Sequence, residues 1–242
     1  MKILEGKTAV ITGGNSGIGY ATAKELKENG AEVIITGRRR DAVEKAAREL
    51  GVTGIVADQS NLEDIKALVS EVTGKSGKID ILLVNAGISK FSLIEFMPEN
   101  IFDEIMDVNF KGAYFTLSKF IPILNEGASV ILLSSTSAHI SPQQASVYAA
   151  SKAALNAVMK IAALELAGRR IRVNAVSPGP ISTEIMEKIG LNQNLEDHMI
   201  STIPLARFGK PQEVAKLVAF LSSGDSSFIT GSEYLIDGGQ CV

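Results

Sequence analysis

The sequence predicts an α/β fold in which a parallel sheet is covered by helices on both faces. Short apolar runs alternate with longer amphipathic or alanine-rich stretches along all 242 residues. Almost all of these runs are continuous rather than interrupted by polar residues, which is typical of strands buried on both faces of a parallel sheet. They number about seven. Ligands of such open sheets bind at the carboxyl ends of the strands.

The individual elements have recognisable beginnings and ends. The first helix places Ile18, Ala21 and Leu26 on one face and charged residues on the other, and Gly30 ends it. The third helix has Asn61 or Ser60 as its N-cap. The predicted strands are residues 8–11, 33–35, 54–57, 79–84, 129–133, 171–176 and 234–236. The predicted helices are residues 17–29, 41–50, 62–72, 98–124, 147–166 and 211–221, with proline in the first turn of the last.

No linker, low-complexity stretch or internal repeat divides the chain. We therefore expect one doubly wound domain over residues 1–242, with the irregular segment 181–208 inserted before the last helix.

The composition argues against several classes of function. Lys and Arg number 24 against 27 Asp and Glu, so the net charge of −3 does not favour a nucleic-acid-binding protein. One cysteine and two histidines provide neither an internal disulfide nor a Cys/His zinc cluster. The first seven residues lack the apolar core of a signal peptide, and no apolar run approaches the ~18 residues of a membrane span. We expect a cytoplasmic protein without metal, nucleic-acid or membrane partners.

A glycine-rich segment, Thr12 to Gly19, connects the first strand to the first helix. Gly13, Gly17 and Gly19 permit a tight turn and close approach of the backbone to a pyrophosphate, and the helix N-terminus supplies free N–H groups for the phosphates. The spacing is not G-x-G-x-x-G, and no Lys-Ser/Thr follows, which disfavours a P-loop. A turn without a ligand is the alternative, but the place after the first strand favours a Rossmann-type dinucleotide site.

The second strand ends at Thr36-Gly37-Arg38-Arg39-Arg40. NAD sites usually carry an acidic residue near this position to hold the ribose hydroxyls, and none is present here. Guanidinium groups suit a 2′-phosphate, so Arg38 and Arg39 favour NADP over NAD, whereas Arg40 is expected at a solvated helix start.

Tyr148 and Lys152 are four residues apart in the alanine-rich helix, which places them on one face. A positive neighbour is expected to lower the pKa of a phenol from about 10 towards the range useful for acid–base catalysis. The strand over residues 129–133 delivers Ser135 to the same edge of the sheet, where its hydroxyl could bind a carbonyl oxygen. Taken alone, a Tyr and a Lys at this spacing are commonplace.

The whole set of motifs resembles the short-chain dehydrogenase/reductase family over nearly the full length, and its 3-oxoacyl reductase members in particular. The glycine segment, Asp58, Asn85-Ala86-Gly87, Pro178-Gly179 with Thr183, and the 13-residue gap from Ser135 to Tyr148 match the family's motifs. The chain departs where the family often has two Asn before Ala-Gly, because Val84 takes the place of the first.

The resemblance implies a role for each matched residue. Tyr148 would be the general acid or base, Ser135 would polarise the carbonyl, Lys152 would hold the nicotinamide ribose, and Asn109 would hold a water linking Lys152 to solvent. The implied catalytic residues are Asn109, Ser135, Tyr148 and Lys152. The expected NADP-binding residues are Gly13, Asn15, Ser16, Gly17, Ile18, Gly19, Arg38, Arg39, Asp58, Gln59, Asn85, Ala86, Gly87, Tyr148, Lys152, Pro178, Gly179, Ile181 and Thr183.

The substrate and the assembly are less defined. The family carries a lid at the segment 181–208, whose Met186, Ile189 and Leu191 could contact substrate or pack the lid. His139 could line the pocket or lie on the surface, while His198 is expected to be solvated. The residues Phe91, Ser92, Gln143 and Gln144 are weaker pocket candidates. The alanine-rich helix and the family's habit indicate a homotetramer or homodimer, and a non-catalytic NADP-binding sensor on the same fold remains the alternative function.

Overall fold

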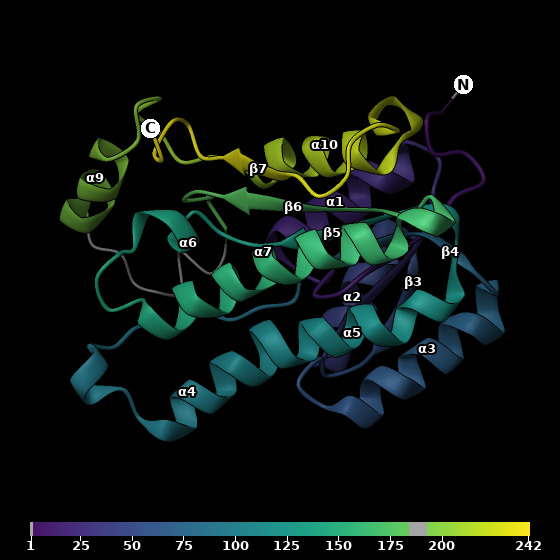
Figure 1. The fold of residues 1–242 in the computed structure, drawn as a ribbon, viewed down its shortest axis with the longest axis horizontal. Coiled ribbons are helices and arrows are strands. Elements are labelled where there is room, and N and C mark those ends of the chain that lie inside the picture. Colours follow the sequence, from purple (N-terminus) through teal and green to yellow (C-terminus); the bar gives the residue numbers. More distant parts are fainter. Residues whose placement is uncertain (1, 184–192) are drawn as a thin grey trace.

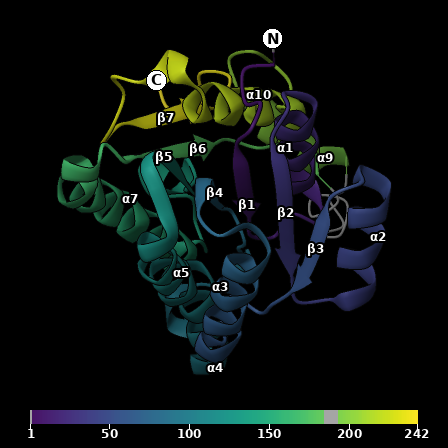
Figure 2. The same cartoon turned by 90° about the vertical axis from the view of Figure 1, so that its right-hand side faces the viewer.

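The computed structural model describes residues 2–183 and 193–242 and confirms the predicted fold class. Seven parallel strands form one sheet in the order β3-β2-β1-β4-β5-β6-β7 (Figures 1 and 2). The strands are β1 (Thr8–Ile11), β2 (Glu32–Gly37), β3 (Thr53–Val56), β4 (Ile79–Val84), β5 (Leu124–Leu133), β6 (Arg172–Pro178) and β7 (Glu233–Ile236).

Helices cover both faces of the sheet (Figure 2). One core cluster joins the strands to α1, α2 and α10, and a second joins them to α3, α5 and α7 on the opposite face. The helices are α1 (Gly17–Glu28), α2 (Arg40–Leu50), α3 (Leu62–Ser76), α4 (Glu99–Met106), α5 (Ala113–Phe120), α6 (Ser137–Ile140), α7 (Ser146–Leu166), α9 (Gln193–Ser201) and α10 (Pro211–Ser222). Of the two proposed caps of α3, Asn61 is the observed one, because its side chain accepts from the N–H of Glu63.

The predicted helical stretch over residues 98–124 is confirmed, but it is not regular, and the strand after it begins earlier than the predicted residue 129. A π-helical segment, Asp107–Gly112, separates α4 from α5, and β5 begins at Leu124 instead of residue 129. A Cβ on Gly112 would lie 2.1 Å from the carbonyl oxygen of Gln59, so this turn packs directly on the backbone after β3. The Gln59 Nε2 also donates to the carbonyl of Val108 inside the π segment, at 3.0 Å. These contacts come from residues distant in sequence and leave no local pattern.

Among the described residues, one helical stretch, Ser146–Arg169, is long and apolar enough to cross a membrane by length and composition. In the structure it packs along β5 and β6 and against α4 (Figure 1). Its buried side chains, such as Leu155 and Met159, belong to the core. Packing in the core therefore accounts for the apolar residues on the buried side of α7.

The chain reverses its direction of strand addition between β1 and β4. Asn85, which follows β4, bridges the two strand ends: its Nδ2 donates to the carbonyls of Thr12 and Gly13, at 2.8 and 3.1 Å. The hydroxyl oxygen of Thr12 accepts in turn from the N–H groups of Asn85 and Ala86. A single asparagine thus joins the loops at the switch point, although Val84 stands where the family often has another.

Candidate active site

The loop after β1 fits a dinucleotide phosphate. A Cβ on Gly19 would lie 2.2 Å from the carbonyl oxygen of Gly13 and 2.6 Å from Asn85 Nδ2, so only glycine allows this packing. Gly17 adopts φ +54 and, apart from Thr183, has open space on its Cβ side. No side chain caps the first turn of α1, and the turn contains no acidic residue. The N–H groups of this turn therefore remain suited to an anion.

Two exposed arginines lie at the carboxyl end of β2. Among the described residues, neither Arg38 nor Arg39 takes part in an ion pair, whereas Arg40 Nη1 lies 3.6 Å from Glu44 Oε1. The side chain of Asn15 lies over Gly37, whose Cβ would be 2.3 Å from Asn15 Oδ1. The region next to the glycine loop thus offers two unpaired positive charges.

Asp58 and Gln59 follow β3 and differ in their availability. The Oδ1 of Asp58 accepts from the N–H and hydroxyl of Ser60, which fixes the carboxylate at the end of the strand. The Gln59 amide is buried, and its Nε2 donates to the carbonyls of Ala86 and Val108. Its side-chain nitrogen therefore braces the loop after β4, while its Oε1 is buried without a hydrogen-bond partner among the described residues.

Asn109 and Gly87 lie next to each other beside Lys152. The Oδ1 of Asn109 accepts from the N–H of Ile88 at 2.8 Å, and its Nδ2 donates to the Ile88 carbonyl at 2.9 Å. A Cβ on Gly87 would lie 3.2 Å from Asn109 Oδ1 and 3.5 Å from Lys152 Nζ. The glycine thus avoids a tight contact between a side chain and Asn109 Oδ1, and Asn109 holds the loop in place.

The structure brings Ser135, Tyr148 and Lys152 together. The N–H of Ser137 donates to Ser135 Oγ at 3.1 Å, which positions the serine oxygen and leaves its proton to donate. The hydroxyls of Ser135 and Ser89 hydrogen bond to the phenol of Tyr148. Lys152 is buried, its Nζ donates to the carbonyl of Leu133 at 2.7 Å, and it lies 5.9 Å from the centre of the tyrosine ring.

The pKa of Tyr148 does not shift in the direction expected from a positive neighbour. Burial raises the pKa of the Tyr148 phenol above its usual value of 10.0, and the hydrogen bonds from Ser135 and Ser89 oppose this shift. The same burial lowers the pKa of Lys152 to about 8. The prediction that Lys152 lowers the pKa of the phenol was therefore wrong in direction, because desolvation outweighs the other contributions at this position.

Ser89 is the site residue that sequence reasoning missed. It stands two residues after Gly87, beyond the end of β4, where any hydroxyl could face the ligand side of the sheet. The residues that follow were considered only as weak pocket candidates. Of these, Phe91 is 49 % exposed and lies edge-on to Tyr148 with ring centres 6.2 Å apart, and the N–H of Ser92 donates to the carbonyl of Gln144. Gln143 and Gln144 are exposed in the loop between α6 and α7.

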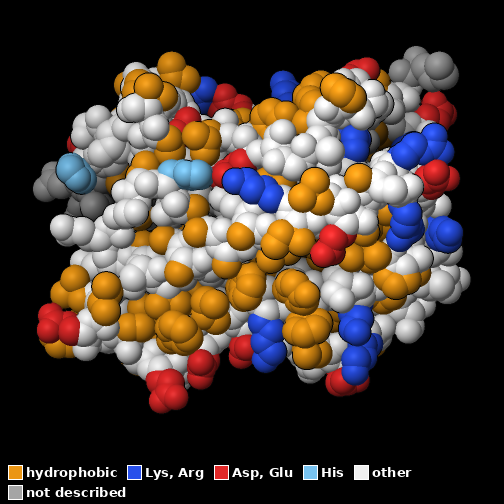
Figure 3. Space-filling model, in the orientation of Figure 1, with side chains coloured by type: hydrophobic (Ala, Val, Ile, Leu, Met, Phe, Trp, Pro, Cys, Tyr) orange, Lys and Arg blue, Asp and Glu red, His pale blue; other side chains and the backbone are white. Residues whose placement is uncertain are grey.

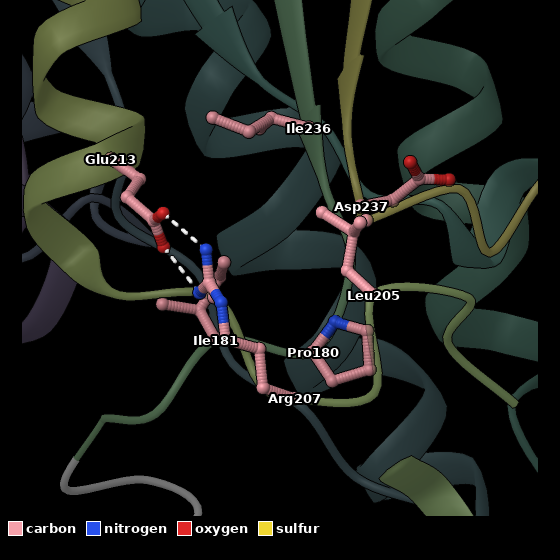
Figure 4. A pocket seen from close by; sticks show the side chains of 9 residues that line it. Pro180, Ile181, Leu205, Arg207, Glu213, Ile236 and Asp237 are labelled. Atoms are coloured by element: carbon pink, nitrogen blue, oxygen red, sulfur yellow. Dashed lines mark hydrogen bonds and ion pairs between the residues drawn. The ribbon is translucent and has the colours of Figure 1, made fainter. Parts of the chain in front are cut away.

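The two ends of the expected lid lie side by side. Ile181 pairs with Gly209 in a short parallel bridge, and the N–H of Gly209 donates to the carbonyl of Pro180. Arg207 Nη1 and Nη2 contact both carboxylate oxygens of Glu213, at 2.9 and 2.6 Å, and form one wall of a pocket beneath this stem (Figure 4). The arginine holds the pKa of Glu213 at about 2.

Other lid predictions have mixed outcomes. Pro178 and Gly179 lie at the end of β6, where the N–H of Thr136 donates to the Pro178 carbonyl. Met186, Ile189 and Leu191 lie outside the described residues. His198 is exposed on α9, as predicted, and His139 is exposed on α6 with its Nε2 2.7 Å from Glu233 Oε1.

Fold and site together define a class: an α/β protein with a dinucleotide-binding glycine loop and a Ser–Tyr–Lys group at the strand ends. A family model described as "Enoyl-(Acyl carrier protein) reductase" matches residues 13–240. The chain is 41% identical to the 3-oxoacyl-[acyl-carrier-protein] reductase FabG of Thermotoga maritima, with 99% of each chain covered. It is 34% identical to human dehydrogenase/reductase SDR family member 4, covering 98% of this chain and 88% of the relative.

Solved structures agree. The short-chain dehydrogenase/reductase of Serratia marcescens superposes with a TM-score of 0.94 at 32% identity, covering 99% of this chain and 100% of the other. The corresponding protein of Mycobacterium marinum has a TM-score of 0.91 at 36% identity, covering 98% and 96%. This chain belongs to the short-chain dehydrogenase/reductase family, oxidoreductases that interconvert carbonyls and alcohols by hydride transfer with a nicotinamide cofactor.

Proposed function

We propose that the chain is an NADP-dependent oxidoreductase that interconverts a ketone or aldehyde and an alcohol, with Tyr148 as the general acid and base. The observation that carries this proposal is the phenol of Tyr148 hydrogen-bonded by Ser135, with the buried Lys152 beside it and Gly87 next to the lysine. Bound NADPH supplies the hydride, and the protein supplies orientation, proton transfer and electrostatics.

The side chains divide the proton chemistry between them. The Ser135 hydroxyl donates to the carbonyl oxygen of the substrate and polarises it. The raised pKa keeps Tyr148 protonated at neutral pH, so it is ready to donate its proton to the developing alkoxide in reduction. Lys152 holds the nicotinamide ribose and stabilises the phenolate once it forms. The side chain of Asn109 is bonded to Ile88 and to Ser151, and we assign to Asn109 the water that links Lys152 to solvent.

Replacing Ser89 by alanine is expected to shift the pH dependence of alcohol oxidation upwards. The reaction in this direction needs the phenolate, and loss of a hydrogen bond that lowers the Tyr148 pKa raises that pKa further. The check is the pH profile of kcat/KM for oxidation of 2-butanol or cyclohexanol with NADP. Ser92→Ala is the control, because its Oγ donates only to the carbonyl of Leu93. A profile of Ser89→Ala that coincides with the wild type would contradict the role of this hydroxyl.

Arg38 and Arg39 are expected to select NADP. Their guanidinium groups are exposed and unpaired among the described residues, as a bidentate 2′-phosphate contact requires. Removing both with Arg38→Ala and Arg39→Ala should raise the KM for NADPH about 10- to 100-fold, since one or two charge-assisted hydrogen bonds are lost, and leave the KM for NADH unchanged. Arg40→Ala, which removes only the pair with Glu44, is the matched control. Equal losses for NADPH and NADH would reject the assignment.

The reaction itself is tested by following NADPH oxidation with a panel of substrates. Ketones, aldehydes, a 3-oxoacyl thioester and an enoyl thioester cover the bonds named by the family description and the Thermotoga relative. Because Ser135 and Tyr148 both donate to oxygen, we expect reduction of C=O and not of C=C. NADPH binding without turnover on any carbonyl would favour the alternative, a non-catalytic NADP sensor.

We further propose a cytoplasmic homotetramer or homodimer. Apolar side chains gather over α4, α5 and α7 on one face (Figure 3). Phe102 and Tyr114 are 45 % and 46 % exposed, and Ile161 and Leu164 are 56 % and 80 % exposed. A second subunit on this face would remove the exposed apolar surface from water.

A further inference from the structure

Glu233 joins three elements behind the active site through one oxygen. Its Oε1 lies 2.7 Å from His139 Nε2 on α6 and accepts from Asn156 Nδ2 on α7 at 2.9 Å and from Ser177 Oγ on β6 at 2.5 Å. The carboxylate is mostly shielded, with 16 % of the side chain exposed, while the His139 side chain is 40 % exposed. Glu233 itself is the first residue of β7.

Each of these partners stands next to a different part of the proposed site. His139 belongs to the short helix that follows Ser135, and the N–H groups of Ala138 and His139 return to the carbonyls of Ser135 and Thr136. Asn156 lies one helical turn after Lys152 on the same face of α7. Ser177 immediately precedes Pro178 and Gly179. One carboxylate oxygen of Glu233 therefore connects the elements that carry Ser135, Lys152 and the segment Pro178–Gly179.

The fold does not need this side chain to attach β7. Backbone pairing along β6 and β7, from Ala175↔Glu233 to Pro178↔Ile236, already joins the two strands. The short helix α6 has only four residues and no side-chain cap, so it has few local interactions of its own. A carboxylate that accepts several hydrogen bonds gives stronger, more directional contacts than a neutral acceptor. The charge of Glu233 thus acts chiefly on α6 and α7.

We propose that Glu233 is a positioning residue of the active site: through His139, Asn156 and Ser177 it sets the relative placement of Ser135, Lys152 and the segment Pro178–Gly179. The inference rests on the proposed function for its kinetic consequence, and it has a structural consequence that does not.

The kinetic test compares Glu233→Gln with the wild type on the carbonyl that the panel identifies. The glutamine keeps the size of the side chain but loses the charge. We expect kcat to fall about tenfold, because small displacements of reacting groups are costly, with the KM for the carbonyl and the Kd for NADPH within about twofold. Glu126→Gln is the matched control, since Glu126 is an exposed carboxylate paired with Arg170. A purely structural residue would lower Tm and leave kcat of the folded enzyme unchanged, and that result would overturn the proposal.

The second test does not require turnover. Hydrogen–deuterium exchange of the protein in the presence of NADPH is measured by mass spectrometry in peptides that cover residues 134–141 and 150–158. Glu233→Gln should speed exchange in the first peptide, which contains α6, and Glu126→Gln should not. Unchanged exchange there overturns the inference even if the enzyme is inactive. Conversely, if the wild type reduces no carbonyl but the Glu233→Gln variant exchanges faster than the wild type in this peptide, only the proposed function is refuted.

Discussion

Replacing Tyr148 by phenylalanine is expected to abolish carbonyl reduction while leaving NADPH binding nearly intact. The substitution removes one oxygen and keeps the ring, which lies edge-on to Phe91 at 6.2 Å. The substitution removes the group that we propose gives its proton to the alkoxide. The loss should reach about 10²- to 10⁴-fold in kcat, the usual contribution of a positioned general acid.

The measurement pairs steady-state kinetics with a titration of NADPH fluorescence. Tyr114→Phe is the matched control, because Tyr114 is exposed on α5, on the apolar face described above, and takes no part in the proposed site. The assignment would be rejected by a Tyr148→Phe enzyme that turns over at a rate comparable to the wild type. A large loss of NADPH affinity would instead indicate that the tyrosine chiefly holds the cofactor.

Replacing Lys152 by methionine is expected to remove activity and to make the folded protein more stable. Burial lowers the pKa of this lysine to about 8, so the native state holds the proton less tightly than the unfolded chain does. The cost of keeping the charge buried is therefore fully present below pH 8 and is relieved as the pH rises towards 10.5. At neutral pH this cost is about 3 kcal/mol, against which loss of the hydrogen bond to Leu133 subtracts about 1 kcal/mol.

The expected net gain is about 2 kcal/mol in the free energy of unfolding at pH 7. Urea denaturation at pH 7 and pH 10 checks both its size and its sign, because the gain should shrink at the higher pH. Lys160→Met on the same helix is the control, since Lys160 is exposed and its loss should change stability by less than about 0.5 kcal/mol. A Lys152→Met protein less stable than the wild type at pH 7 would show that the buried charge is well compensated.

Such a trade of stability for function is expected where a charge must be held out of water. The buried ammonium donates to the carbonyl of Leu133, and the rest of the core supplies the stability that offsets its cost. A Cβ on Gly87 would lie 3.5 Å from Lys152 Nζ, so the glycine limits crowding around the charge.

Local pattern was sufficient for the main elements. Mostly apolar runs such as 79–84 and 8–11 became β4 and β1 with the predicted bounds, because strands buried on both faces are predominantly apolar. It predicted the helical stretch over residues 98–124 but not the π segment Asp107–Gly112 within it. At this segment the Gln59 backbone packs against Gly112, a contact between residues far apart in the chain that local spacing does not contain.

The candidate site divides in the same way. Strand ends and helical spacing were enough to place Ser135, Tyr148 and Lys152 near one another, while their proposed roles in proton transfer came from the resemblance of the whole set of motifs to the family. The identities of Ser89 and Glu233 carried no comparable signal. A serine after a strand and a glutamate at the start of one have many roles, and their partners, Tyr148 and His139, come from other elements.

By itself, the sequence determined the parallel sheet, the glycine loop and the chemical types of side chain at its edge, because these depend on local spacing and burial pattern. Only the tertiary structure decided the electrostatics. Whether Lys152 acidifies Tyr148 depends on how much water each has lost, and here desolvation raises the phenol pKa and lowers that of the lysine. Desolvation is set by all the surrounding atoms at once, so it cannot be derived from the spacing of two residues.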